Sequence, residues 1–192
     1  PLLRDDLLEL LGLMQAKKLE VHLTTNGLLL TPQIIANLRQ LGVRVVISID
    51  GATAATYESI RGANFDKVVE QARNCSQEGL LEAIDFILLK RNYTEIPAIF
   101  QLAASIGVPK ITLIGLKPCQ DYSGELLSSQ EYREAIKLAC RAAQETGVEF
   151  FFDEPFFWAT VKELGLTAHL PAVDVGIVIP STSACAFGEY LF

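Results

Sequence analysis

The chain has 192 residues, half of them hydrophobic, and a formal net charge of −7. This length suits one domain with a substantial core and the beginning of a second. The acidic balance excludes the basic surface that nucleic acid or an anionic membrane would require, so we expect neither as a partner. The longest late apolar run, 170–180, is interrupted by Asp174 and is too short to span a bilayer.

The first residues, "PLLRDDLLELLGLMQAKK", lack the basic start and the cleavage site of a signal peptide. They predict a turn followed by an amphipathic helix. The chain starts at Pro1 rather than at Met, and it stops just after the beginning of a predicted strand. We therefore expect an internal segment of a longer protein.

Predicted helices and strands alternate along the chain. Helices are expected at 5–17, 32–41, 65–78, 95–106 and 128–147, and strands at 19–27, 43–51, 81–89 and 109–116. Repeated strand–helix–strand units predict parallel strands joined by helical crossovers. The expected architecture is α/β, either an open sheet or part of a barrel. The aromatic stretch 148–159 predicts core or a pocket wall.

Polar residues gather where the predicted strands end. The ends read "TTNG" at 24–27, "SIDG" at 48–51, "KRN" at 90–92 and "GLKP" at 115–118. Ligands of parallel α/β proteins meet the carboxyl ends of the strands, so these segments predict a small-molecule site. From the residues alone, each of the first two segments could equally form a turn or cap a helix.

Four segments resemble, in order and spacing, the second to fourth strand units of the radical S-adenosylmethionine (SAM) enzymes. They are "PLLRDDLLELL", "LTTNG", "VVISIDG" and "YESIRGANFDKVVE". The resemblance covers roughly residues 1–117 and implies a partial (β/α)6 TIM-like barrel, truncated at both ends. Residues 118–180 would then hold the last barrel helix and a linker.

The resemblance also implies a function. Such an enzyme reductively cleaves SAM to a 5′-deoxyadenosyl radical, which abstracts hydrogen from a substrate. The substrate would be a small molecule or a peptide, in peptide modification or cofactor biosynthesis, and a flavodoxin or ferredoxin would donate the electron. The alternative is a non-catalytic α/β domain that binds a nucleoside-like ligand.

Five of the implied cofactor-site residues lie in the first half of the chain. Pro1 would end the family's Gly-Gly-Glu-Pro turn, and Thr24 would face the substrate. Asn26 would shape the loop that faces SAM. Ser48 would contact the ribose or methionine part of SAM, and Asp50 would hold that loop or the ribose.

Four further residues are candidates for the cofactor site, three from the resemblance and Asp85 from its place in a strand. Arg61 is either a loop residue making surface or carboxylate contacts or a contact of the SAM carboxylate, while Leu116 and Lys117 would lie near the adenine. Asp85 is the one charge within "AIDFILL", so it either faces the barrel interior and a ligand or lies at an exposed edge. Lys90 and Asn92 are expected in an ordinary solvated loop, although an Asn followed by "TEIP" recurs in relatives of this family.

The family holds a [4Fe-4S] cluster on a C-x3-C-x2-C motif, and the four cysteines of this chain include no such motif. We therefore expect the cluster ligands outside the chain, and the segment alone to be inactive. Cys75 and Cys140 are expected to be small hydrophobic residues within helices. The absence of close cysteine pairs favours a reducing compartment, hence the cytoplasm.

The segment "CAFGEYLF" at 185–192 resembles the opening of the SPASM or twitch extension of these enzymes. The resemblance implies that residues 181–192 begin such a domain and that Cys185 ligates an auxiliary iron–sulfur cluster. A lone buried cysteine is the alternative.

Overall fold

The computed structural model describes residues 1–62, 64–117, 120–153, 160 and 163–165. The strands are β1 (His22–Thr25), β2 (Arg44–Ser48), β3 (Leu81–Leu88), β4 (Lys110–Gly115) and β5 (Glu149–Phe152). The α-helices are α1 (Leu7–Ala16), α2 (Pro32–Gln40), α3 (Ala54–Arg61), α4 (Phe65–Gln77), α5 (Ile96–Ile106) and α6 (Ser129–Thr146). Two short 3-10 helices are η1 (Tyr93–Glu95) and η2 (Gln120–Glu125).

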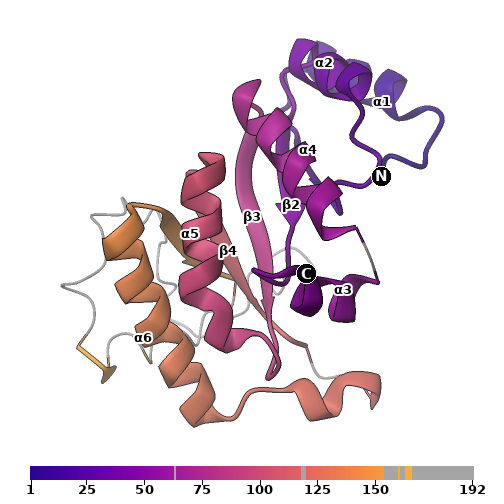
Figure 1. Cartoon of the computed structure of the whole chain (residues 1–192). Coiled ribbons are helices and arrows are strands. Elements are labelled where there is room, and N and C mark those ends of the chain that lie inside the picture. The colour runs from indigo at the N-terminus through magenta and orange to yellow at the C-terminus, as the bar shows by residue number, and fades with distance from the viewer. Residues whose placement is uncertain (63, 118–119, 154–159, 161–162, 166–192) are drawn as a thin grey trace, which may run out of the picture.

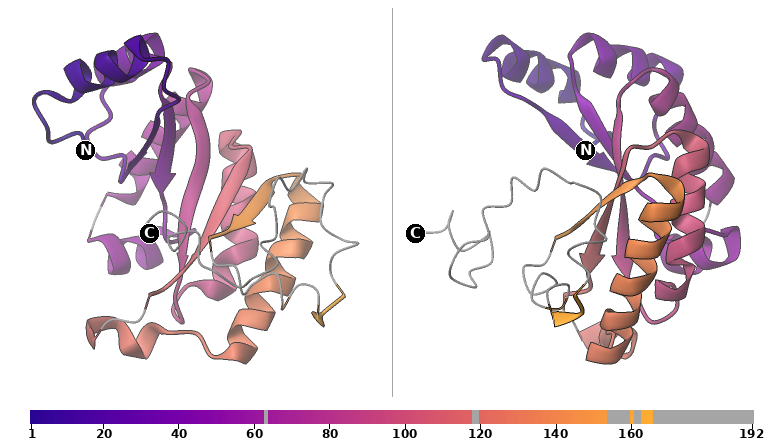
Figure 2. Two further views of the ribbon diagram at one scale, coloured as in Figure 1. Left: turned by 180° about the vertical axis from the view of Figure 1, so that it is seen from behind. Right: turned by 90° about the vertical axis from the view of Figure 1, so that its left-hand side faces the viewer.

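The five strands form one sheet in the order β1-β2-β3-β4-β5, and every neighbouring pair is parallel. Helices α4, α5 and α6 lie together on one face of this sheet (Figures 1 and 2). A doubly wound sheet instead reverses its strand order and carries helices on both faces. The order and the one-sided helices therefore match a segment of a barrel, and the predicted α/β fold with helical crossovers is confirmed.

The two faces of the sheet differ in burial. In β3, Ile84, Phe86 and Leu88 are fully buried, whereas Asp85 and Ile87, which point to the opposite face, are half-buried. The same alternation of buried and half-buried residues runs through β4. The helix-covered face therefore supplies most of the core, while the other face remains partly open among the described residues.

All predicted helices and strands are present, with their ends shifted by a few residues. Local capping explains several boundaries. At the start of α2, the hydroxyl of Thr31, which precedes Pro32, accepts a hydrogen bond from the Ile34 amide. At the start of α6, Ser128 and Glu131 form a reciprocal capping box. Cys75 and Cys140 are buried, as predicted. No helix among the described residues combines the length and the apolar character needed to cross a membrane.

The turn between β2 and α3 depends on a glycine. A Cβ atom added at Gly51 would lie 2.5 Å from the backbone nitrogen of Tyr57 and 2.9 Å from its Cα. Both are backbone atoms of α3, so a side chain at position 51 would push the helix away from the strand. The close approach of β2 and α3 therefore requires glycine.

We predict that Gly51→Ala lowers the free energy of unfolding by about 1–3 kcal/mol, because the added methyl group overpacks the turn. Gly12→Ala is the matched control: Gly12 lies in α1, with no atom within 4 Å of the added Cβ. That change should raise the free energy of unfolding by roughly 0.5–1 kcal/mol. Chemical denaturation of both variants measures the two values, and equal effects would contradict the close packing at Gly51.

Candidate functional site

A pocket of about 460 Å³ lies at the carboxyl ends of β1 and β2. Four residues expected in the cofactor site line it together: Pro1, Thr24, Asn26 and Ser48. They come from the N-terminal segment, the end of β1 and the end of β2, and the parallel pairing of the two strands brings their ends to one edge. The remaining lining residues are Leu2, Leu3, Thr25, Leu28 and Leu29.

The loop after β1 is shaped by its own polar side chains. The Asn26 carboxamide oxygen accepts a hydrogen bond from the Leu28 amide at 3.2 Å, and the Thr25 hydroxyl accepts one from the Gly27 amide, also at 3.2 Å. Asn26 thus forms an Asx turn and also lines the pocket. The turn and the pocket are two roles of one residue rather than alternatives.

Ser48 ends β2 beside the pocket and is 9% exposed. Its Cα pairs in register with that of Asp85 on β3, so both residues belong to the open face of the sheet. No described residue hydrogen-bonds the Ser48 hydroxyl. The hydroxyl is therefore free to bind a ligand in the pocket.

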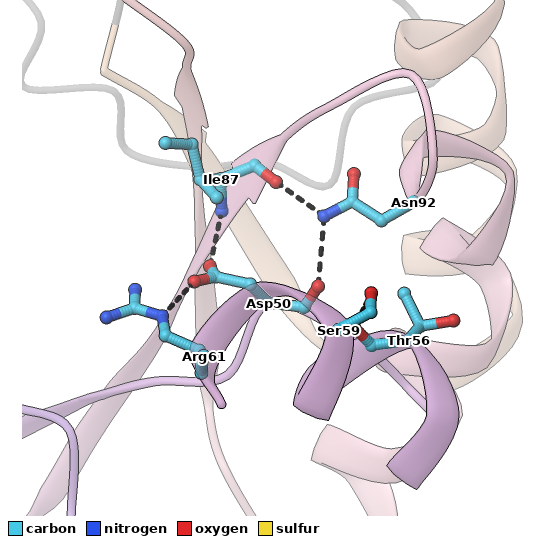
Figure 3. A network of polar contacts seen from close by, with 6 residues as sticks. All are labelled: Asp50, Thr56, Ser59, Arg61, Ile87 and Asn92. Carbon is cyan, nitrogen blue, oxygen red and sulfur yellow. Dashed lines mark hydrogen bonds and ion pairs between the residues drawn. The ribbon is translucent and has the colours of Figure 1, made fainter. Parts of the chain in front are cut away.

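Asp50, two residues after Ser48, is 1% exposed and does not line the pocket, and its carboxylate is held by two segments of the chain (Figure 3). Oδ1 accepts a hydrogen bond from the Ile87 amide at 2.8 Å, and Oδ2 forms an ion pair with Nε of Arg61. Both oxygens are thus used within the chain. These contacts favour the loop-holding role among the two that the sequence suggested for Asp50.

Arg61 ends α3 and is directed by Asp50. Its remaining guanidinium nitrogens point away from the Asp50 carboxylate (Figure 3), and its side chain is 35% exposed. A guanidinium presents several donors in a fixed plane, so one edge can pair with Asp50 while another contacts an anionic group. Arg61 does not line the pocket described above.

Asn92 was expected in a solvated loop, and this expectation was wrong because its side chain is fully buried. Its amide nitrogen donates to the carbonyl oxygens of Asp50, at 3.0 Å, and Ile87, at 2.8 Å (Figure 3). Its oxygen accepts from the Leu89 amide at 2.8 Å. Lys90, in the same loop, is exposed as expected.

Asp85 lies in β3, the central strand of the five, so the exposed-edge alternative is excluded. Burial raises the pKa of its carboxyl group above the ordinary value, against the lowering effect of a hydrogen bond with Thr112. Repulsion from Asp50 and Asp153 raises this pKa further, and Arg61 lowers it. Ionised Asp85 therefore costs the folded state free energy on the open face of the sheet.

We predict that Asp85→Asn stabilises the protein at neutral pH but not in acid. The pKa of Asp85 is higher in the folded than in the unfolded state, so the native protein loses stability as the pH rises through this window. Asparagine removes that loss and keeps an oxygen that can bond Thr112. The difference in melting temperature between variant and wild type should grow from about pH 3 to about pH 7. A difference in melting temperature that does not change with pH would contradict the raised pKa of Asp85.

The structure separates the remaining expected residues from this pocket. Leu116 is half-buried and Lys117 is exposed, and both follow β4, two strands from β2. Neither they nor Asp85 line the pocket. Cys185 and the region 181–192 lie outside the described residues.

No group of metal-ligating side chains occurs among the described residues. Burial raises the pKa of the Cys75 and Cys140 thiols to about 11, so neither is a ready thiolate ligand. His22 contacts Glu82 through Nδ1 at 2.5 Å, and this contact accounts for its position. The described part of the chain therefore does not fit an iron–sulfur cluster.

Comparison with known families identifies the fold and the class. Residues 1–118 match the family model described as the radical SAM superfamily, and the chain belongs to this superfamily.

Two proteins of Methanosarcina barkeri are similar in sequence. An Fe-coproporphyrin III synthase is 32% identical over 72% of this chain and 36% of its own length. An AdoMet-dependent heme synthase is 36% identical over 62% of this chain and 35% of its own. The chain thus spans about a third of the length of these curated relatives.

Solved structures share the fold at low sequence identity. The crystal structure of Streptococcus suis SuiB superposes with a TM-score of 0.70 at 14% identity, over 83% of this chain and 38% of SuiB. A domain of pyruvate-formate lyase-activating enzyme from Bacteroides vulgatus gives a TM-score of 0.60 at 12% identity, over 76% of this chain and 88% of that one. These similarities assign the barrel-type fold.

Proposed function

We propose that this chain is the SAM-binding part of a radical SAM enzyme, with SAM bound in the pocket at the carboxyl ends of β1 and β2. The observation that carries the proposal is the convergence of Pro1, Thr24, Asn26 and Ser48 on one pocket at the carboxyl edge of the sheet. Family membership supports it independently. SAM, when bound, would supply the family's chemistry, in which one-electron cleavage gives a 5′-deoxyadenosyl radical that abstracts hydrogen from a substrate.

The pocket is compatible with this cofactor. Its volume of about 460 Å³ lies within the range of small-molecule sites, roughly 300–1,000 Å³. Its wall combines leucine side chains with three hydroxyl-bearing residues, Thr24, Thr25 and Ser48, and with the carboxamide of Asn26. A ligand with apolar surface, hydroxyl groups and an amino acid end suits such a wall.

The chain's own residues would bind and orient the cofactor. The unpartnered Ser48 hydroxyl would hydrogen-bond its ribose or methionine part, and Thr24 would face the substrate. Asn26 would keep the loop after β1 in place through its turn. Asp50 would hold the strand tip and aim Arg61, whose free nitrogens would pair with the carboxylate of SAM.

The rest of the machinery belongs to the proposal for the whole protein. The [4Fe-4S] cluster would be ligated outside this chain and reduced by a flavodoxin or ferredoxin. Leu116 and Lys117 would lie near the adenine, and Cys185 would begin a SPASM-type domain with an auxiliary cluster. A cytoplasmic location suits such a redox centre.

Two substrate classes remain within this proposal. The sequence relatives named as Fe-coproporphyrin III synthase and heme synthase favour cofactor biosynthesis. A structure of SuiB bound to the precursor peptide SuiA, similar at a TM-score of 0.71, favours peptide modification. The sequence relatives share 32% and 36% identity against 14% for SuiB, so we favour cofactor biosynthesis.

The second candidate function is a non-catalytic domain that binds a nucleoside-like ligand. The absence of metal-ligating groups among the described residues favours it. The intact protein distinguishes the two after cluster reconstitution: an enzyme forms 5′-deoxyadenosine from SAM under reducing conditions. SAM binding without that product would favour the binding domain.

We predict that Ser48→Ala weakens SAM binding to the intact protein several-fold, on the order of 1 kcal/mol, because one neutral hydrogen bond is lost. Isothermal titration calorimetry measures the affinity. Ser105→Ala is the matched control, since its exposed hydroxyl in α5 donates only to the Leu102 carbonyl oxygen of its own helix.

The control should leave SAM affinity unchanged, and both variants should remain folded. Equal affinity in wild type and Ser48→Ala would remove Ser48 from the cofactor site. If wild type itself failed to bind SAM, the proposal for the pocket would fall.

A further inference from the structure

The segment that follows β3 is hydrogen-bonded to the turn that follows β2. Asn92, fully buried, donates from its amide nitrogen to the Asp50 carbonyl oxygen at 3.0 Å (Figure 3). The same nitrogen donates to the Ile87 carbonyl oxygen at 2.8 Å, and the Asn92 oxygen accepts from the Leu89 amide. One buried carboxamide thus joins the end of β3 to the main chain just after β2.

Glu95 is bonded to the same turn at Ala52, two residues after Asp50. Its Oε2 accepts a hydrogen bond from the Ala52 amide at 2.8 Å, and its Oε1 accepts one from the Thr56 hydroxyl in the first turn of α3. The Glu95 amide donates to the Asn92 carbonyl oxygen at 2.8 Å, so both residues lie on one tight turn. A spacing of three places their side chains on the same side.

The turn after β2, residues 50–56, has little freedom to adopt another position. Gly51 lies so close to the Tyr57 backbone that no side chain fits, and the Asp50 carboxylate bonds the Ile87 amide. Ser48 ends β2 two residues before this turn, and Arg61 ends α3, whose first residues belong to the turn. Any shift of the turn would therefore move both residues.

We propose that Asn92 and Glu95 are positioning residues of the ligand pocket: they fix the 50–56 turn against β3 and thereby place Ser48 and Arg61. The inference rests on the proposed function in taking SAM as the ligand, whereas the contacts themselves are observed in the structure. Neither residue lines the pocket. Their described side-chain bonds end on residues 50, 52 and 56, on Ile87 near the end of β3 and on Leu89 of their own loop, so they reach the pocket through the turn.

The chain offers a conservative pair of variants at Glu95. In Glu95→Gln the amide oxygen can accept from the Ala52 amide while the amide nitrogen donates to the Thr56 hydroxyl oxygen, so both bonds survive. Glu95→Ala removes both. Ser128→Ala is the control for general loss of stability, because it removes the capping box of α6 but no hydrogen bond to residues 50–56.

The experiment uses the intact protein and three readouts: melting temperature, hydrogen exchange of the 50–56 amides, and SAM affinity by calorimetry. Glu95→Ala should speed exchange at 52–56 and weaken SAM binding by about tenfold, and Glu95→Gln should restore both. Ser128→Ala should lower the melting temperature while leaving exchange at 52–56 and SAM affinity as in wild type.

Two outcomes overturn the inference. If Glu95→Ala left exchange of the turn unchanged, Glu95 would not hold it. If exchange rose but SAM affinity matched that of Ser128→Ala, the contacts would serve stability alone, and the proposed function would stand. Failure of wild type to bind SAM would overturn the proposed function and, with it, the positioning role, even if the turn loosened as expected.

Discussion

The buried carboxylate of Asp50 is the interaction on which the tip of β2 depends. Removing a carboxylate from water costs several kcal/mol unless charge and hydrogen bonds compensate. Here one carboxylate oxygen accepts a hydrogen bond from the Ile87 amide at 2.8 Å, and the other forms an ion pair with Arg61. Because Ile87 belongs to β3 and Arg61 to α3, satisfying this one charge fixes three segments relative to one another (Figure 3).

The parallel sheet explains why the pocket lies where it does. Each strand body is packed on its helix-covered face, so polar groups that need solvent or a ligand occur at the strand ends and on the open face. The end of β1 contributes the Asn26 turn, and the end of β2 contributes Ser48. With the strands in chain order, consecutive loops become neighbours, and two loops that are 20 or so residues apart form one wall.

The features predictable from sequence were those that follow from local periodicity and from the rules of parallel sheets. This class includes all α-helices except α3, the strands β1 to β4, and the meeting of Thr24, Asn26 and Ser48 at one edge. The buried state of Asn92 does not, because its partner Asp50 lies 42 residues away, and the "TEIP" that follows this asparagine does not say what it contacts. Helix α3 is short, and β5 is hidden in an aromatic run without clear alternation, so both were missed.

The central claim is that SAM binds at the carboxyl ends of β1 and β2. It is tested most directly by mapping where SAM protects the backbone of the intact protein. Hydrogen exchange with and without SAM should show protection at residues 24–29 and 48–52, around the 460 Å³ pocket. The groove between α2 and α4, lined by residues such as Ile35, Arg39 and Asn74, serves as an internal reference and should not change. Protection at that groove, or none at either strand end, would contradict the assignment of the cofactor site.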